Sequence, residues 1–309
     1  GRLWVATEFG GVAIINYYML GFTDGGLLTA PVEYITKGYG DSYISGSSVR
    51  CMVADSYGNV WLGLYGEGVD LLTFSQPQFN QTGYKPYDTA AGLTTKSVLS
   101  LCLDKKGNIY VGTDGGGVNI LDKTGRRTGV IPVGKYGSVQ AALRDSKGRL
   151  WFGCFNDGAY IYTGGRLERA PAIKEHTDVR AFYEDKDSSM WIATSSGIYV
   201  TDGDGQSVKR HYDVPGNLVR SIVRDGNGRI WVATFGNGLL IYSPGMKLLE
   251  SYNTGKGFTS NTVNQIMRGS DGRMWVCTAE GLVSFAAGAG SKYTAYGSGN
   301  NLANLHIRS

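Results

Sequence analysis

Short apolar runs of about five residues recur along the whole chain, separated by clusters of Gly, Asn and Asp. The stretch 218–242 (LVRSIVRDGNGRIWVATFGNGLLIY) has two such runs around Asp225–Gly228 and a third after Gly236–Gly238. Runs rich in Val, Ile and Trp with Gly/Asn turns between them predict antiparallel strands joined by hairpins. A further run, Met246–Tyr252, is polar at alternate positions and predicts a more exposed fourth strand. Such a sheet cannot bury both faces alone, so it needs neighbours.

The same unit recurs at a regular interval. Successive aromatic anchors are 57, 49, 41, 40, 40 and 44 residues apart, close to the 40–45 residues typical of a four-stranded propeller blade. Most anchors follow a D-x-x-G turn, in which Asp bonds the turn backbone and Gly takes the position of positive φ. Two turns depart from the pattern, because Asp185–Ser188 lacks the Gly and Gly269–Gly272 lacks the Asp. The anchors are Trp4, Trp61, Tyr110, Trp151, Trp191, Trp231 and Trp275.

The two ends of the chain complete one repeat. The sequence opens at Gly1–Trp4, in the middle of a unit, and Leu302–Arg308 has the spacing of the missing first strand. We therefore expect an all-β fold, a seven-bladed β-propeller of four-stranded antiparallel blades, closed when the C-terminal strand pairs with the N-terminal strands. We expect one domain over residues 1–309, with blade one split between 1–41 and 300–309. The long first intervals indicate an insertion at 17–41 in blade one and a second elaboration at 76–87 in blade two. An opening on the turn itself suggests a module of a longer chain.

Composition limits the function classes. No apolar run of 18 residues occurs, so no direct membrane insertion is expected. The net charge of +4 comes without a basic run or arm, so no nucleic-acid partner is expected. The three histidines are scattered, and we expect no metal, cofactor or catalytic residue. The cysteines at 51, 102, 154 and 277 fall in four predicted strands and are either small buried hydrophobes or include a Cys51–Cys102 bridge.

The repeat resembles a known family. The pattern V-x-x-I-x-x-D-x-x-G-x-x-W-x-x-T-x-x-G-L is similar to the two-component regulator propeller repeat, and Val219–Leu239 and Asn261–Leu282 follow it closely. The resemblance covers essentially the whole chain. It implies the sensor region of a membrane-bound histidine kinase, often a hybrid system governing polysaccharide use, in a periplasmic or other extracytoplasmic location. It also implies neighbouring sensor domains and a homodimer in that context, but it marks no ligand residues.

Propeller geometry predicts a candidate site. The start of each first strand and the tip of each second hairpin share one mouth of the ring. The residues after the first-strand aliphatic position are expected to be Arg50, Leu99, Gln140, Arg180, Arg220, Asn264 and Ala303. Arginine pairs with carboxylate or sulfate, and aromatic faces stack on sugars, which favours an oligosaccharide or acidic glycan as ligand. The candidate ligand-binding residues are Arg50, Arg180, Arg220, Phe9, Tyr65, Phe155 and Phe235.

Other interpretations of the same residues stay open. The arginines could pair with neighbouring Asp residues or line a water-filled channel, and the tip aromatics could fill gaps between blades. The favoured function is a non-catalytic sensor for an oligosaccharide. The alternatives are a scaffold that binds protein domains at its rim and, from another class, a propeller lyase, which would need an acid/base pair at one mouth.

Overall fold

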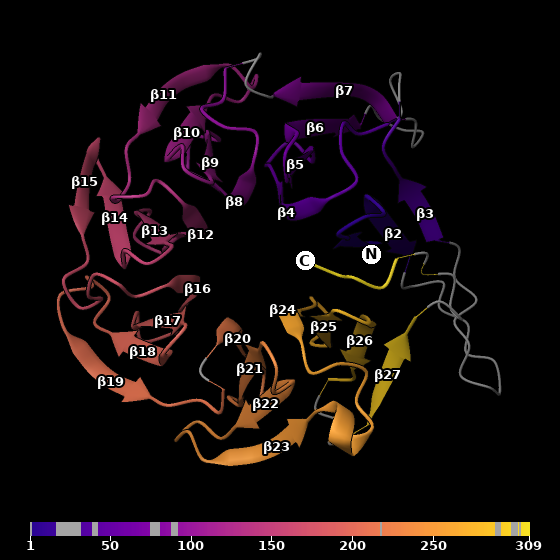
Figure 1. Ribbon diagram of the computed structural model, residues 1–309, viewed down its shortest axis with the longest axis vertical. Helices are drawn as coiled ribbons and strands as arrows, with labels where there is room; N and C mark the ends of the chain where they lie inside the picture. The colour runs from indigo at the N-terminus through magenta and orange to yellow at the C-terminus, as the bar shows by residue number, and fades with distance from the viewer. Residues whose placement is uncertain are drawn as a thin grey trace.

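Seven antiparallel sheets are arranged in a ring, and the termini meet beside each other (Figure 1). The computed structural model describes residues 2–16, 32–38, 43–74, 81–87, 92–216, 218–287, 292–297, 302 and 304–309. Within this part of the chain the only helical element named is the 3-10 turn η2 (Thr254–Lys256), and no helix is long and apolar enough to cross a bilayer. The fold is the all-β seven-bladed propeller that the repeat predicts.

Each blade is a meander whose strands follow one another in space as in sequence. Blade one contains β1 (Arg2–Ala6), β2 (Val12–Asn16) and β3 (Val32–Ile35). Blades two to four contain β4 (Val49–Ala54), β5 (Val60–Leu64), β6 (Gly68–Phe74), β7 (Gln81–Tyr87), β8 (Val98–Leu103), β9 (Ile109–Thr113), β10 (Val118–Leu121), β11 (Arg127–Ile131), β12 (Val139–Arg144), β13 (Leu150–Cys154), β14 (Ala159–Thr163) and β15 (Arg166–Arg169). Blades five to seven contain β16 (Val179–Glu184), β17 (Met190–Thr194), β18 (Gly197–Thr201), β19 (Val208–Tyr212), β20 (Val219–Arg224), β21 (Ile230–Thr234), β22 (Leu239–Tyr242), β23 (Leu248–Tyr252), β24 (Val263–Arg268), β25 (Met274–Thr278), β26 (Gly281–Phe285) and β27 (Tyr293–Tyr296).

Two segments expected to be insertions contribute strands. β3 lies within the predicted insertion 17–41 of blade one, and β7 lies within the predicted elaboration 76–87 of blade two. Each is the outermost strand of its sheet. Outer strands carry little of the apolar repeat, so their sequences are the least recognisable part of a blade. The rest of the predicted insertion, residues 17–31 and 39–41, lies outside the described residues.

The turn pattern fixes the large aromatic anchor. In blade six, Asp225 accepts hydrogen bonds from the backbone N–H groups of Asn227 and Arg229 and from Nε1 of Trp231 at 2.9 Å. Asp145 holds Trp151 in the same way, at 3.0 Å. A buried indole N–H without a hydrogen-bond partner is costly. One carboxylate therefore both stabilises the turn and accepts the hydrogen bond of the buried indole.

The core is divided among the junctions between blades. The described residues form seven apolar clusters, each containing side chains from two neighbouring blades. Trp61, Trp151 and Trp231 are among the largest fully buried side chains. All four cysteines are unpaired, and burial raises the pKa of each thiol to about 12. The prediction of buried hydrophobic cysteines is confirmed for Cys102, Cys154 and Cys277, whereas Cys51 is only partly buried, and Cys51 and Cys102 form no bridge.

The C-terminal segment closes the ring. Thr7 and Ile307 form an antiparallel bridge, and the Arg308 N–H donates to the Ala6 carbonyl at 2.9 Å. Leu302 and Ile307 are buried in the cluster that joins blade one to Trp275 of blade seven. The segment thus takes the innermost place in blade one that β4 takes in blade two, as Figure 1 shows near the ring centre. Closure of this kind leaves the inner edge of β1 paired.

Candidate ligand-binding site at the channel mouth

A β-bulge at the start of each described inner strand directs one side chain toward the ring axis. In β4, β8, β12, β16, β20 and β24 the register shifts after the first residue, which leaves the second residue unpaired with the next strand. A bulge re-aims the side chain it carries. All six of these side chains line an axial cavity of about 860 Å³, a volume in the usual range for ligand sites. They are Arg50, Leu99, Gln140, Arg180, Arg220 and Asn264.

The seventh such position belongs to Arg308. The Glu8 N–H donates to the His306 carbonyl, as the Phe155 N–H donates to the Ser138 carbonyl, one residue before the inner strand. Ile307 is therefore equivalent to Val139, and Arg308 to Gln140. The expectation that Ala303 occupies this position is wrong by five residues, and Ala303 itself lies outside the described residues. The available signal was the aliphatic–Arg pair at 307–308, which repeats the pairs at 49–50, 179–180 and 219–220.

The expected site residues gather at one mouth but divide between wall and rim. Arg50, Arg180, Arg220 and Phe155 line the cavity. The other three are at the hairpin tips, outside the cavity lining. The tip backbones are tied to the starts of the inner strands: the Tyr65 N–H bonds the Ser48 carbonyl at 3.0 Å. All four aromatic side chains are exposed, by 68% in Phe9, 47% in Tyr65, 46% in Phe155 and 48% in Phe235.

Two of the tip aromatics are covered by arginines of their own blades. The Arg50 guanidinium lies 4.6 Å from the centre of the Tyr65 ring, and that of Arg220 lies 4.9 Å from the Phe235 ring. These cation–π contacts hold the guanidinium groups at the mouth. Phe9 has an edge contact with His306 at 6.5 Å.

Glu8 joins two of the arginines and was missed as a site residue. One of its oxygens lies 3.2 Å from Arg50 Nη2, and the other accepts a hydrogen bond from Arg308 Nε. Burial alone would raise the pKa of Glu8, but the hydrogen bond from Arg308 and the positive charge of Arg50 outweigh burial. The pKa of Glu8 therefore lies below its ordinary value, and the carboxylate is held ionised between the two guanidinium groups.

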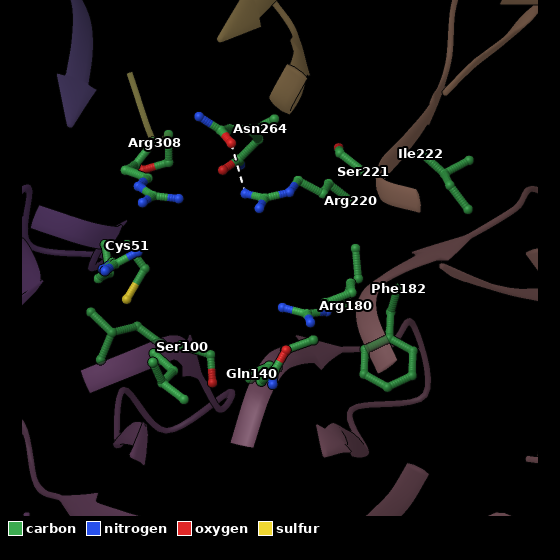
Figure 2. Close-up of a pocket in the computed structure, with 18 of the residues that line it drawn as sticks. Cys51, Ser100, Gln140, Arg180, Phe182, Arg220, Ser221, Ile222, Asn264 and Arg308 are labelled. Carbon is green, nitrogen blue, oxygen red and sulfur yellow. Dashed lines mark hydrogen bonds between the residues drawn. The ribbon is translucent and has the colours of Figure 1, made fainter. Parts of the chain in front are cut away.

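Arg220 has a different environment. Its Nη1 donates to Asn264 Oδ1 at 2.7 Å, and no carboxylate among the described residues lies within ion-pairing distance. Figure 2 shows this pair on one wall of the cavity, with Arg180 and Arg308 on either side. Burial and the like charges of Arg308 and Arg180 lower the pKa of Arg220 to about 10. The group stays positive at neutral pH without a compensating anion.

Blades two, four and five hold buried polar atoms without hydrogen-bond partners near this mouth. Arg180 pairs with Asp178, and burial raises the pKa of Asp178 despite that ion pair. Buried polar atoms are normally hydrogen-bonded, so the side chains with unpartnered atoms near this mouth retain hydrogen-bonding capacity that a water molecule or a ligand would use. The atoms near this mouth that have no partner are Ser48 Oγ, Arg50 Nε, Gln140 Oε1, Asp178 Oδ1 and Arg180 Nε.

This arrangement suits binding of an anionic or hydroxyl-rich molecule. Guanidinium groups present paired donors to a carboxylate or sulfate, and a cavity wall of arginines concentrates positive potential. The residues lining the cavity include no histidine. The Glu8 carboxylate is already neutralised by two arginines and has a lowered pKa, which makes it a weak base. In the described part of the chain no three His, Cys, Asp or Glu side chains are grouped to hold a metal ion.

The sequence matches the model of a known protein family. The model of the two component regulator propeller matches residues 43–66, 92–115, 134–156, 174–196, 213–236 and 257–280. Each matched segment includes the inner strand of a blade and ends at or just after the tip that follows the second strand. Comparison with curated protein sequences found no match.

Among solved structures, the chain is similar to the extracellular domain of the hybrid two-component system BT3049 from B. thetaiotaomicron, with 35% identity and a TM-score of 0.68. The alignment covers all of this chain but 41% of that one, so this chain spans less than half of the relative's length. Two further structures share only the fold. Virginiamycin B lyase from Staphylococcus aureus has 12% identity and a TM-score of 0.66, covering 81% of this chain and 84% of the lyase. PorZ from Porphyromonas gingivalis has 19% identity and a TM-score of 0.66, covering 94% of this chain and 46% of PorZ.

Proposed function

Because the chain belongs to the two-component regulator propeller repeat family, we propose that it is a non-catalytic sensor propeller whose arginine-lined mouth binds an oligosaccharide carrying acidic groups. The relative from B. thetaiotaomicron is an extracellular domain, which supports a periplasmic or other extracytoplasmic location. In this proposal the propeller works beside neighbouring domains of a larger sensor that pairs as a homodimer.

The observation that carries the proposal is the unneutralised charge of Arg220. Arg50 and Arg180 already have carboxylate partners in Glu8 and Asp178. Arg220 has only an amide oxygen and an aromatic face, and it lies in the field of other arginines. An acidic group placed in the cavity would relieve this repulsion and gain paired hydrogen bonds.

Signal transmission in this proposal needs no chemistry at the site. A ligand at the mouth favours whichever arrangement of the sensor dimer binds it more tightly. The difference in affinity between the two arrangements sets the largest shift that the ligand can produce. The mouth is built from all seven blades and includes the C-terminal segment, so a ligand there contacts the seam of the ring as well as its walls.

The test is an array of carboxylated, sulfated and neutral oligosaccharides, followed by calorimetry on the strongest binder. Arg220→Met keeps the unbranched apolar part of the side chain but removes its charge, and it should weaken binding about tenfold or more. Arg210→Met, on the exposed outer strand β19, is the control and should change nothing. If Arg180→Ala and Arg220→Ala both leave binding of every active glycan unchanged, the mouth is not the ligand site. If no glycan binds, a rim that binds protein domains becomes the better explanation.

A further inference from the structure

Each blade contributes one inner-strand residue and one tip residue to the mouth, and blades four and five lack the arginine–aromatic contact of blades two and six. In blades two and six an arginine covers the tip aromatic, as Arg50 covers Tyr65 and Arg220 covers Phe235. In blade four the tip aromatic is Phe155, but the inner-strand residue is Gln140. In blade five the inner-strand residue is Arg180, but the tip residue is Ser195.

Phe155 consequently presents an uncovered aromatic face to the cavity. It lines the cavity, and its side chain is 46% exposed. Among the described residues no ring and no cation stacks against it, whereas Phe235, with 48% exposure, has a guanidinium over its face. An exposed aromatic ring beside polar groups is the usual surface on which the apolar face of a sugar ring packs.

Two polar side chains near Phe155 each have an atom without a hydrogen-bond partner. Gln140 lines the cavity, and its Oε1 accepts no hydrogen bond, while Arg180 Nε donates none. Figure 2 shows Gln140 and Arg180 next to each other on the cavity wall. Both atoms are buried in this arrangement, so a hydroxyl group, which can both donate and accept, would reach them once the two side chains turn toward the cavity. Rotation of the Gln140 amide toward the cavity would bring its oxygen to such a group.

We propose that blades four and five form a sugar-ring subsite, in which a pyranose ring packs on Phe155 and its hydroxyl groups bond Gln140 and Arg180. This inference rests on the proposed function and adds to it. It divides the mouth into a ring-binding part at Phe155 and an anion-binding part at Arg220. The ligand class is then an oligosaccharide in which a hydroxyl-bearing sugar adjoins one with a carboxylate or sulfate group.

The experiment uses the strongest binder from the array of carboxylated, sulfated and neutral oligosaccharides, titrated by calorimetry into four proteins. Phe155→Ala should weaken binding about tenfold, because the packed ring loses its support. Tyr57→Ala removes an exposed aromatic in the Asp55–Gly58 turn, which does not line the cavity, and its affinity should stay within about threefold of wild type. Gln140→Ala should weaken binding by about fivefold, the loss of one hydrogen bond. Thermal unfolding of each variant checks that the fold is intact.

The outcomes separate the two proposals. If wild type binds none of the oligosaccharides, both the sensor function and the subsite are wrong. If wild type binds and Arg220→Met weakens binding, but Phe155→Ala and Gln140→Ala bind as wild type does, the function stands and the subsite is refuted. If Tyr57→Ala and Phe155→Ala lose affinity equally, the loss is not specific to the uncovered face of Phe155, and the subsite is again refuted.

Discussion

Glu8 accepts a hydrogen bond from Arg308 although the two residues are 300 positions apart in the sequence. The contact joins the first hairpin tip to the C-terminal segment, at the seam that closes the ring and at the mouth of the cavity. Ring closure and the candidate site therefore share residues. A change that loosens the seam should also disturb the charge arrangement around Arg50, which shares the Glu8 carboxylate.

The seam should carry a large part of the stability of the fold. Ile307 is fully buried against blades one and seven, so Ile307→Ala should lower the free energy of unfolding by about 2–4 kcal/mol. Leu248→Ala, on the outer strand β23 where the side chain is 45% exposed, is the matched control and should cost less than about 0.5 kcal/mol. Urea unfolding followed by tryptophan fluorescence measures both. Equal costs would mean that the C-terminal segment does not stabilise the ring.

Asp70 should make stability depend on pH. Burial raises the pKa of Asp70 to about 6, although its carboxylate accepts hydrogen bonds from the Ser45 N–H at 2.8 Å and from the Ser45 hydroxyl. The folded state then binds a proton more tightly than the unfolded state. The stability that this protonation gives is fully present below the ordinary carboxyl pKa of 3.8 and is lost as the pH rises through about 6.

Blade three has an uncharged equivalent of the Asp70–Ser45 contact. In blade three Asn119 accepts from the Thr94 N–H and donates to the Thr94 hydroxyl, in the place where blade two has Asp70 and Ser45. Asp70→Asn should therefore keep the contact, raise stability above pH 6 by on the order of 2 kcal/mol, and flatten the profile between pH 4 and 6. Thermal unfolding across this range measures the effect. An unchanged profile would show that Asp70 is ionised as readily in the folded chain as in the unfolded one.

A glycine in the irregular turn of blade five should increase the stability of the protein. Ser188 has φ 61°, where the regular turns have glycine, as at Gly58 with φ 84°. A side chain in this left-handed region is strained, so Ser188→Gly should raise the free energy of unfolding by about 0.5–1 kcal/mol. Gly58→Ser introduces the same strain where no atom lies within 4 Å of an added Cβ, and it should cost about 1 kcal/mol. Shifts of the same sign in both variants would contradict this account.

The cysteines should be unreactive in the folded protein. Burial raises the pKa of each thiol to about 12, so almost no thiolate is present at neutral pH. Ellman's reagent should react slowly with the native chain and rapidly with four thiols in denaturant without a reductant. Two thiols in denaturant, rising to four after reduction, would mean that a disulfide such as Cys51–Cys102 exists after all.

Much of the fold was readable from the sequence because the determining signals are local. Each hairpin turn, each buried tryptophan and each recurring glycine lies within one unit of about 40 residues, and the unit repeats. The position after the first-strand aliphatic residue was readable for the same reason, which is how Arg50, Arg180 and Arg220 were brought to one mouth. The outer strands β3 and β7 were expected to be insertions, because the outermost strand of a blade carries little of the repeating apolar pattern in its sequence.

The register of the C-terminal segment and the partners of the arginines could be determined only from the tertiary structure. The C-terminal segment is a fragment of a repeat, and its register depends on hydrogen bonds to Ala6 and Glu8 and on burial of Ile307, all from the other end of the chain. Only those contacts place Arg308, rather than Ala303, at the mouth. Likewise, a repeat fixes where an arginine stands but not its partner: Glu8 neutralises Arg50 while Arg220 is left with an amide. Charge pairing between blades is set by how neighbouring blades pack and, for Glu8 and Arg308, by closure of the ring, because the paired groups belong to different repeats.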